Sequence, residues 1–82
     1  MRTIGERVRW LRERKLMSQE DLSRLTGIPE ATISRLENDR TTPRPSTLRK
    51  LATSLNVNPA WLRFGEGEPE GESAARSSLA AA

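Results

Sequence analysis

The stretch that decides the fold is residues 19–38, with the sequence QEDLSRLTGIPEATISRLEN. Its apolar residues are spaced to form a wedge between two short helices: Leu22, Ile28, Ile33 and Leu36. Gly27 permits the sharp turn between the helices, because glycine adopts the left-handed conformation at little cost. Ser23 is small at a position where the second helix must approach the first closely. The stretch therefore predicts a helix-turn-helix.

The ends of these two helices are marked by residues that favour helix termini. Ser18 is expected to be the N-cap of the first helix, which ends at Gly27 and carries Leu25 beside Leu22 on its buried face. The second helix is predicted over about residues 30–37. Pro29 suits its start, because proline has no N–H group to leave unsatisfied.

A further helix is predicted before this motif, over about residues 4–14. Thr3 and Glu6 form a candidate capping box, in which the hydroxyl accepts from a free backbone N–H group and the carboxylate reaches back. Trp10 lies beside the apolar stripe of this helix and is expected to half-cover the bundle.

Two more helices are predicted after a loop at residues 40–45. The first has apolar residues at i, i+3, i+4 and i+7, namely Leu48, Leu51, Ala52 and Leu55, and Asn56 is its left-handed stop. The second opens with Asn58 and Pro59 and extends to about Phe64. The sequence thus predicts an all-α fold of five helices.

The composition changes after Gly65. Residues 1–64 carry 13 Lys and Arg against 7 Asp and Glu residues, a formal charge of +6, whereas residues 65–82 have a formal charge of −3. Residues 1–65 are therefore predicted to be one folded domain, and residues 66–82 an acidic, Ser/Ala-rich disordered tail. The basic domain suggests a polyanionic partner, and the 12 Arg against 2 Lys residues favour bidentate contacts to phosphate or guanine.

Several classes of function are disfavoured by what the composition lacks. The chain has no Cys and no His, which removes disulfides, thiolate metal sites and the usual general base. With no paired carboxylates in a plausible pocket and no Gly-rich phosphate loop, we do not expect an enzyme, a metal site, a cofactor or a small-molecule ligand. No signal peptide or membrane-spanning stretch is visible, so a cytoplasmic location is expected.

A longer pattern covers about three quarters of the chain. It consists of Ile4-Gly5-x-Arg7-Val8-x-x-Leu11-Arg12, Ser18-Gln19-Glu20-x-Leu22, Gly27-Ile28, Thr32-Ile33-Ser34-Arg35-Leu36-Glu37-Asn38, Leu48-x-x-Leu51-Ala52 and Trp61-Leu62-x-x-Gly65. In this pattern residues 4–65 resemble the phage-repressor family of helix-turn-helix proteins, the Cro/CI or XRE group. The resemblance implies a lambda-repressor-like bundle that binds double-stranded DNA as a homodimer, with its third helix in the major groove.

The resemblance also implies which residues contact DNA. Base contacts are expected from the third helix, at Glu30, Ala31, Ser34 and Arg35. Phosphate contacts are expected at Gln19, Thr32, Asn38, Arg40, Thr41, Thr42 and Arg44. Independently of the resemblance, the N-terminal amides of the helix that Gln19 opens favour an anion. The family also has a pair that bridges the first and third helices, matched here by Arg12 and Glu37.

Two positions depart from the family pattern. Pro29 stands where the family usually has a Ser or Thr cap, so the third helix is expected to start up to one residue away from the usual position. Glu30 is an anion near phosphates and requires a partner, for which Gln19 or a cytosine amino group is a candidate.

The dimer interface is expected around the fifth helix, at Val57, Trp61, Leu62 and Phe64, although Trp61 is also a candidate core residue. The function implied is a transcriptional regulator, more specifically a repressor, that binds a palindromic operator. A phage repressor, a restriction–modification controller and an antitoxin-type autoregulator all fit. The alternative is a protein-interaction module that retains the fold without specific DNA binding. The acidic tail is either a solubilising end or a competitor of DNA for the basic face.

Overall fold

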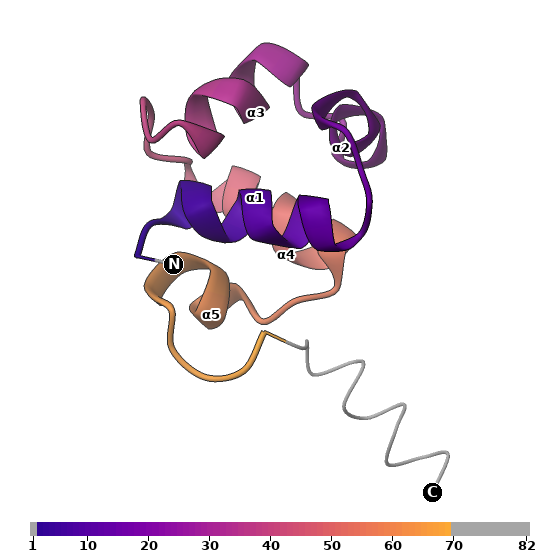
Figure 1. Ribbon diagram of the computed structural model, residues 1–82. Helices are drawn as coiled ribbons and strands as arrows, with labels where there is room; N and C mark the ends of the chain where they lie inside the picture. Colours follow the sequence, from indigo (N-terminus) through magenta and orange to yellow (C-terminus); the bar gives the residue numbers. More distant parts are fainter. Residues whose placement is uncertain (1, 70–82) are drawn as a thin grey trace, which may run out of the picture.

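The computed structural model describes residues 2–69, which fold into five α-helices (Figure 1). The helices are α1 (Ile4–Arg14), α2 (Gln19–Thr26), α3 (Glu30–Glu37), α4 (Pro45–Leu55) and α5 (Pro59–Phe64). The all-α prediction is confirmed, and the bounds agree closely with those expected. Helix α4 begins at Pro45, a residue expected in the preceding loop, because proline is well suited to the first helical position.

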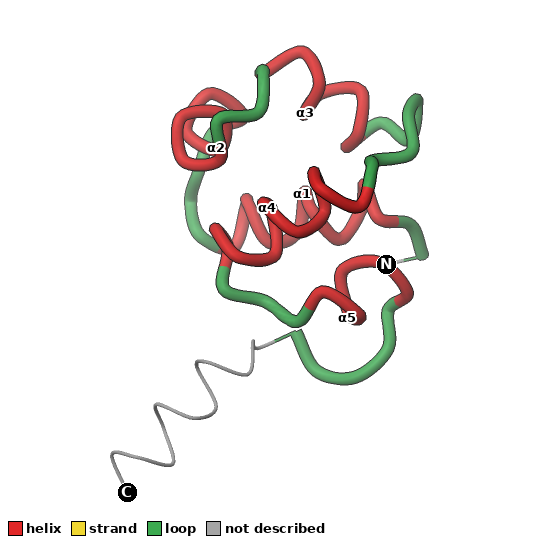
Figure 2. Tube along the Cα trace, turned by 180° about the vertical axis from the view of Figure 1, so that it is seen from behind, coloured by secondary structure: helices red, strands yellow, loops and turns green. Residues whose placement is uncertain are grey.

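The five helices pack around one core, with α2 and α3 on one side of the molecule and α5 on the opposite side (Figure 1). Helix α1 crosses the middle, with α2 and α3 on one side of it and α5 on the other, and α4 passes behind α1 (Figure 1). The reverse view shows α4 in front and α5 again across the bundle from α3 (Figure 2). Helices α2 and α3 therefore form an outer layer that α1 and α4 support. No helix of the described part of the chain is long and apolar enough to cross a membrane.

The core contains the apolar residues that the sequence patterns singled out. The buried hydrophobic residues are Val8, Leu11, Leu22, Ile28, Ile33, Leu36, Leu48, Leu51, Ala52, Leu55, Val57, Trp61 and Leu62. The prediction for Leu25 is wrong, because 51% of this residue is exposed. Helix α2 buries only one residue, Leu22, so its covered stripe is too narrow to include the next turn.

Local capping explains where α2 begins and ends. The Ser18 hydroxyl accepts from the Asp21 N–H group at 3.0 Å, and the Asp21 carboxylate accepts from the Ser18 N–H group at 2.8 Å. Gly27 ends the helix with a φ of 76°. At α1 the Thr3 hydroxyl accepts from the N–H group of Glu6 as expected. The Glu6 carboxylate accepts from the backbone of residue 2 at 2.9 Å, which differs from the capping box that was predicted.

Helix α1 approaches the end of α3 very closely. A Cβ atom at Gly5 would overlap the carbonyl oxygen of Leu36, so only glycine permits this packing. Ser23, which was expected to allow a close approach of α2 and α3, is half-buried. Its hydroxyl donates to the Ile28 carbonyl at 2.6 Å, and this bond closes the turn between the two helices.

A buried guanidinium fastens α5 to α1. Arg7 is only 4% exposed, and its Nε donates to the Leu62 carbonyl at 2.7 Å. A second nitrogen, NH2, donates to the Arg63 carbonyl at 2.8 Å. Arg7 thus satisfies carbonyl groups at the C-terminal end of α5, where a cation is also favoured by the helix dipole. Together with the Gly5 contact, this fixes α1 between the outer layer and α5.

Candidate nucleic-acid interface

Helix α3 has one covered face and one open face. Ile33 and Leu36 are 1% and 2% exposed, and they hold the helix against the bundle. The four predicted base-contact residues lie away from this buried pair. Glu30, Ala31 and Arg35 are exposed and Ser34 is half-buried. The structure therefore leaves these four residues on the outward side of α3, where a ligand can reach the exposed ones.

Pro29 lies immediately before α3. Pro29 occupies the N-cap position and makes no side-chain capping bond, and the helix begins at Glu30. The carbonyl of Pro29 accepts from the N–H groups of Thr32 and Ile33 at 2.9 and 3.1 Å. Within the described residues, the Glu30 side chain makes no hydrogen bond or ion pair with another residue.

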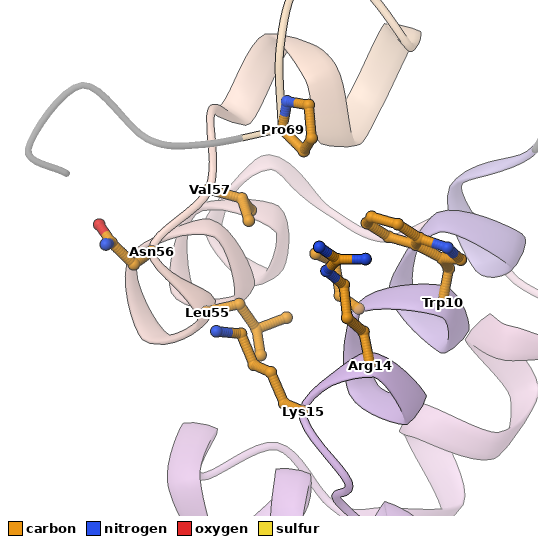
Figure 3. A pocket seen from close by; sticks show the side chains of 8 residues that line it. Trp10, Arg14, Lys15, Leu55, Asn56, Val57 and Pro69 are labelled. Carbon is orange, nitrogen blue, oxygen red and sulfur yellow. The ribbon is translucent and has the colours of Figure 1, made fainter. Parts of the chain in front are cut away.

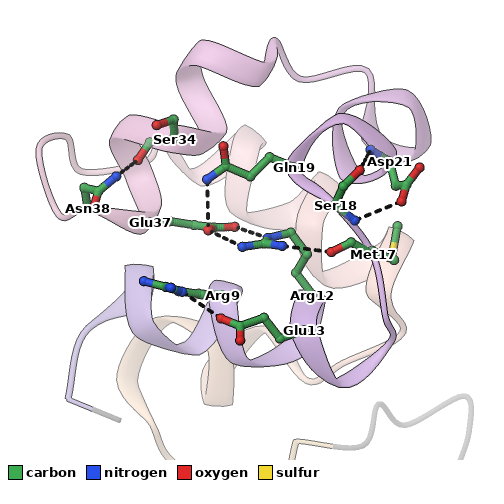
Figure 4. Close-up of polar contacts among 10 residues, drawn as sticks. All are labelled: Arg9, Arg12, Glu13, Met17, Ser18, Gln19, Asp21, Ser34, Glu37 and Asn38. Carbon is green, nitrogen blue, oxygen red and sulfur yellow. Dashed lines mark hydrogen bonds and ion pairs between the residues drawn. The ribbon is translucent and has the colours of Figure 1, made fainter.

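Beneath the open face, one carboxylate joins three helices (Figure 4). Glu37 accepts from Arg12 in a fork, with Nε at 2.8 Å and NH2 at 3.0 Å. It also accepts from Nε2 of Gln19 at 3.2 Å. Gln19 therefore pairs with Glu37 and not with Glu30, so of the two candidate partners of Glu30 the structure does not support Gln19. The arrangement links α1, α2 and α3 through a single buried charge.

The Arg12–Glu37 pair is largely removed from water. The side chains are 13% and 3% exposed, and the remaining Arg12 nitrogen NH1 donates to the Met17 carbonyl at 2.8 Å. The hydrogen bond to Glu37 raises the pKa of Arg12, partial burial opposes that rise, and the charge of Glu37 adds to it. Arg12 therefore stays positively charged, and the pair stabilises the helix-turn-helix as a support for α3.

The loop after α3 gathers hydrogen-bond donors around a small hollow. A pocket of about 160 Å³ is lined by Thr32, Leu36, Thr41, Thr42, Pro43, Arg44 and Thr47. Hydroxyl and guanidinium groups are the donors that proteins commonly present to phosphate oxygens. The structure thus brings together four of the predicted phosphate contacts. It adds Thr47, which the sequence analysis missed because this residue lies inside α4 and is adjacent to the others only in space.

The other predicted phosphate contacts lie outside this hollow. Arg40 and Asn38 are exposed. The Asn38 amide donates to the Ser34 carbonyl at 2.8 Å, which caps the end of α3. One N–H group of the Asn38 amide is therefore already used in capping α3.

Three exposed arginines in and after α3 differ from Arg9 on α1 and Arg24 on α2, because they form no ion pair among the described residues. Arg9 pairs with Glu13 along α1, and Arg24 pairs with Glu20 along α2. Among the described residues, no ion pair involves the exposed side chains of Arg35, Arg40 and Arg44. An uncompensated group of guanidinium charges beside an open helix face attracts a polyanion.

The four residues predicted at a dimer interface have different environments. Val57, Trp61 and Leu62 are 7%, 7% and 0% exposed and belong to the core of a single chain. The interface prediction is therefore wrong for Leu62, which has no surface left for a second copy. Phe64 is 61% exposed, with the Arg63 guanidinium 5.1 Å from its ring centre.

Comparison with known proteins agrees with this geometry. A family model described as Helix-turn-helix (HTH_3) matches residues 8–62. The chain is 37% identical over 68 residues to the HTH-type transcriptional repressor RghR of Bacillus subtilis (strain 168), an alignment that covers 82% of this chain and 50% of RghR. It is 41% identical over 58 residues to the HTH-type transcriptional regulator RghRB of the same organism, covering 70% and 42% of the two chains. The chain thus spans about half the length of these relatives.

Two solved structures have the same arrangement of helices. One is the P22 c2 repressor in complex with a synthetic operator, with a TM-score of 0.75 and 29% identity. That match covers 80% of this chain and all of the repressor chain. The other is the restriction–modification controller protein C.AhdI from Aeromonas hydrophila, with a TM-score of 0.68 and 34% identity, covering 72% and 89% of the two chains.

Proposed function

The chain belongs to the helix-turn-helix (HTH_3) family of transcriptional regulators, and we propose that it is a cytoplasmic repressor that binds a palindromic operator as a homodimer. The observation that carries this proposal is the open face of α3 beside three exposed arginines that form no ion pair with any described residue: Arg35, Arg40 and Arg44. An exposed helix face with arginines beside it suits a helix that enters the major groove, which is lined by phosphates. The operator complex of the similar P22 c2 repressor supports the same choice of ligand.

In the proposed complex, the exposed residues of α3 discriminate between bases. The guanidinium of Arg35 donates two hydrogen bonds to O6 and N7 of a guanine, and the Glu30 carboxylate accepts from a cytosine amino group. Ala31 contacts a thymine methyl group. Because Glu30 has no partner among the described residues, a cytosine amino group supplies the hydrogen bond that the free protein lacks.

Phosphates are held on two sides of α3. Gln19, at the start of α2, contacts one phosphate run, and the threonine hollow with Arg44 contacts the other. Arg40 adds a further cation on the second side. These contacts orient α3 in the groove but carry no sequence information themselves.

We propose a homodimer because Phe64 exposes a large aromatic surface on α5. Two-fold symmetry requires a palindromic operator with half-sites about one helical turn, ~34 Å, apart. Helix α5 lies across the bundle from α3, so contacts at Phe64 leave the open face of α3 free (Figure 1).

Selection of bound sites from random duplex DNA tests the proposal, and a palindromic consensus is expected. Sedimentation of the free protein and of the DNA complex gives the stoichiometry. With Arg40 and Arg44 from each subunit on phosphates, affinity is expected to fall about 10²-fold between about 50 and 200 mM salt. An unselective pool together with affinity that does not change with salt would favour the protein-interaction module instead.

A further inference from the structure

A concave site lies beside the C-terminal ends of α1 and α4, and none of the residues that line it belongs to α2 or α3 (Figure 3). The pocket has a volume of about 390 Å³. Its apolar wall contains three buried residues, Leu11, Leu55 and Val57. Small-molecule sites in proteins are concave, mostly apolar and roughly 300–1,000 Å³ in volume, so this pocket has room for a ligand of one or two rings.

Two further residues give the pocket its sides. The half-buried ring of Trp10 forms one side, and it is tilted at 55° to the ring of Trp61 with the ring centres 5.8 Å apart. Pro69 forms another side, and its carbonyl accepts from the N–H group of Asn58, the N-cap of α5, at 3.1 Å. An aromatic ligand can therefore pack against the indole as well as against the apolar wall.

The rim of the pocket is basic. Arg14 and Lys15 extend from α1 toward the pocket, with the Arg14 guanidinium 5.0 Å from the Trp10 ring centre (Figure 3). Both side chains are exposed, and neither forms an ion pair with any described residue, whereas Arg9 on the same helix pairs with Glu13. No acidic residue is among the described residues that line the pocket. The charge of the rim therefore suits an anion.

We propose that this pocket binds a small aromatic carboxylate, whose ring packs between Trp10 and the apolar wall and whose carboxylate lies beside Arg14 and Lys15. Burial of the ring stabilises the complex, and the two cations add an attraction that a neutral ligand of the same shape does not obtain. The pocket shares no residue with the open face of α3, so this inference does not depend on the proposed operator binding.

The test titrates the full chain with 2-naphthoate and follows the indole N–H resonance of Trp10 by NMR, after assignment of that resonance with Trp10→Phe. A ligand of this size is expected to shift the resonance saturably, with a dissociation constant on the order of 1 mM. The neutral 2-naphthamide has the same ring system, and it is expected to bind roughly three- to ten-fold more weakly because it forms no ion pairs.

Charge variants locate the carboxylate in the complex. Arg14→Gln combined with Lys15→Gln is expected to weaken the binding of 2-naphthoate by the same roughly three- to ten-fold and to leave the binding of 2-naphthamide unchanged. The matched control combines Arg49→Gln with Lys50→Gln, which removes two exposed cations of α4 that do not line the pocket. This control is expected to retain the affinity of the unmodified chain for 2-naphthoate.

The proposal is overturned if the Trp10 resonance does not shift, if the carboxylate and the amide bind alike, or if the two charge variants weaken the binding of 2-naphthoate equally. It is also overturned if the Trp10 resonance shifts with the concentration of the protein and not with the added carboxylate. That result would assign the pocket to an interface with a second copy of the chain.

Discussion

The amide of Gln19, the first residue of α2, donates to the carboxylate of Glu37, the last residue of α3, at 3.2 Å. Arg12 from α1 binds the same carboxylate through two nitrogens. A carboxamide has two N–H groups, so Gln19 retains one donor for a second acceptor. The network therefore fixes the direction in which that donor points.

Replacing Gln19 is expected to weaken DNA binding without altering its sequence preference. In our proposal Gln19→Ala removes a hydrogen bond to a phosphate, which is worth about 1.5–3 kcal/mol. Because the side chain is neutral, the dependence of affinity on salt should not change. Binding curves on the selected site and its single-base variants, at two salt concentrations, provide the test. The control is Thr53→Ala, an exposed residue of α4. A loss confined to particular bases would make Gln19 a base contact.

Removing Glu37 is expected to destabilise the fold strongly. Glu37→Ala leaves the Arg12 charge buried without its partner, which costs about 3–5 kcal/mol. Glu13→Ala is the matched control, because Glu13 pairs with Arg9 where the side chains are 57% and 62% exposed. That pair contributes about 0.5 kcal/mol. Urea unfolding measures both variants, and similar midpoints would show that the Arg12–Glu37 pair is not buried in solution.

The capping box of α2 should make stability depend on acid pH. Hydrogen bonds from the backbone and side chain of Ser18 lower the pKa of Asp21 below its ordinary value of 3.8. A lowered pKa means that the ionised form stabilises the fold above pH 3.8, and that this contribution is lost as the pH falls through the lower folded-state value. At neutral pH the Asp21→Asn variant should therefore have a lower urea midpoint than the unmodified chain. This difference in midpoint should disappear in acid. Urea midpoints from neutral pH to about pH 2 test this. A constant difference would contradict it.

The turn between α1 and α2 contains a strained leucine. Leu16 has a φ of 56° and is 93% exposed. Its left-handed backbone conformation is strained, and burial of the side chain does not compensate for that strain. Leu16→Gly removes about 1–2 kcal/mol of strain, while the greater entropy of the unfolded state costs about 0.5–1 kcal/mol, for a net gain of up to about 1.5 kcal/mol. The same change at Leu25, inside α2, should cost about 1 kcal/mol. Thermal unfolding compares the two, and a loss of stability in both would mean that Leu16 makes a contact in solution.

The helices were predictable because their signals are local. Ser18, Gly27 and Asn56 each mark a helix end through bonds or a backbone conformation within a few residues. The apolar spacing of α4 likewise identified its buried face. Leu25 follows Leu22 by three residues, a spacing that also occurs in α4. Its exposure depends on how far the neighbouring helices extend, which cannot be inferred from a local sequence pattern.

Interactions between distant elements were harder to predict. The carbonyl groups that Arg7 binds lie 55 and 56 residues further along the chain, so its burial could not be inferred from helix periodicity. Trp61 and Leu62 are apolar residues of a kind that suits either a core or an interface. Only the docking of α5 on α1 shows that they complete the core. The candidate site was predictable in outline because most of its residues lie in α3 and the loop that follows. Thr47 was missed because it lies in α4 and is close to the site only in the folded chain.

The most direct test of the account compares Arg35→Ala with Arg40→Ala on the selected operator and on its single-base variants. Our proposal places Arg35 on a base edge and Arg40 on a phosphate. Arg35→Ala should cost about 1–3 kcal/mol per half-site and relax the preference at one base pair. Arg40→Ala should weaken binding to all sequences evenly and reduce the dependence on salt. If Arg35→Ala weakens every variant equally, Arg35 contacts the backbone and the proposed orientation of α3 in the groove is wrong.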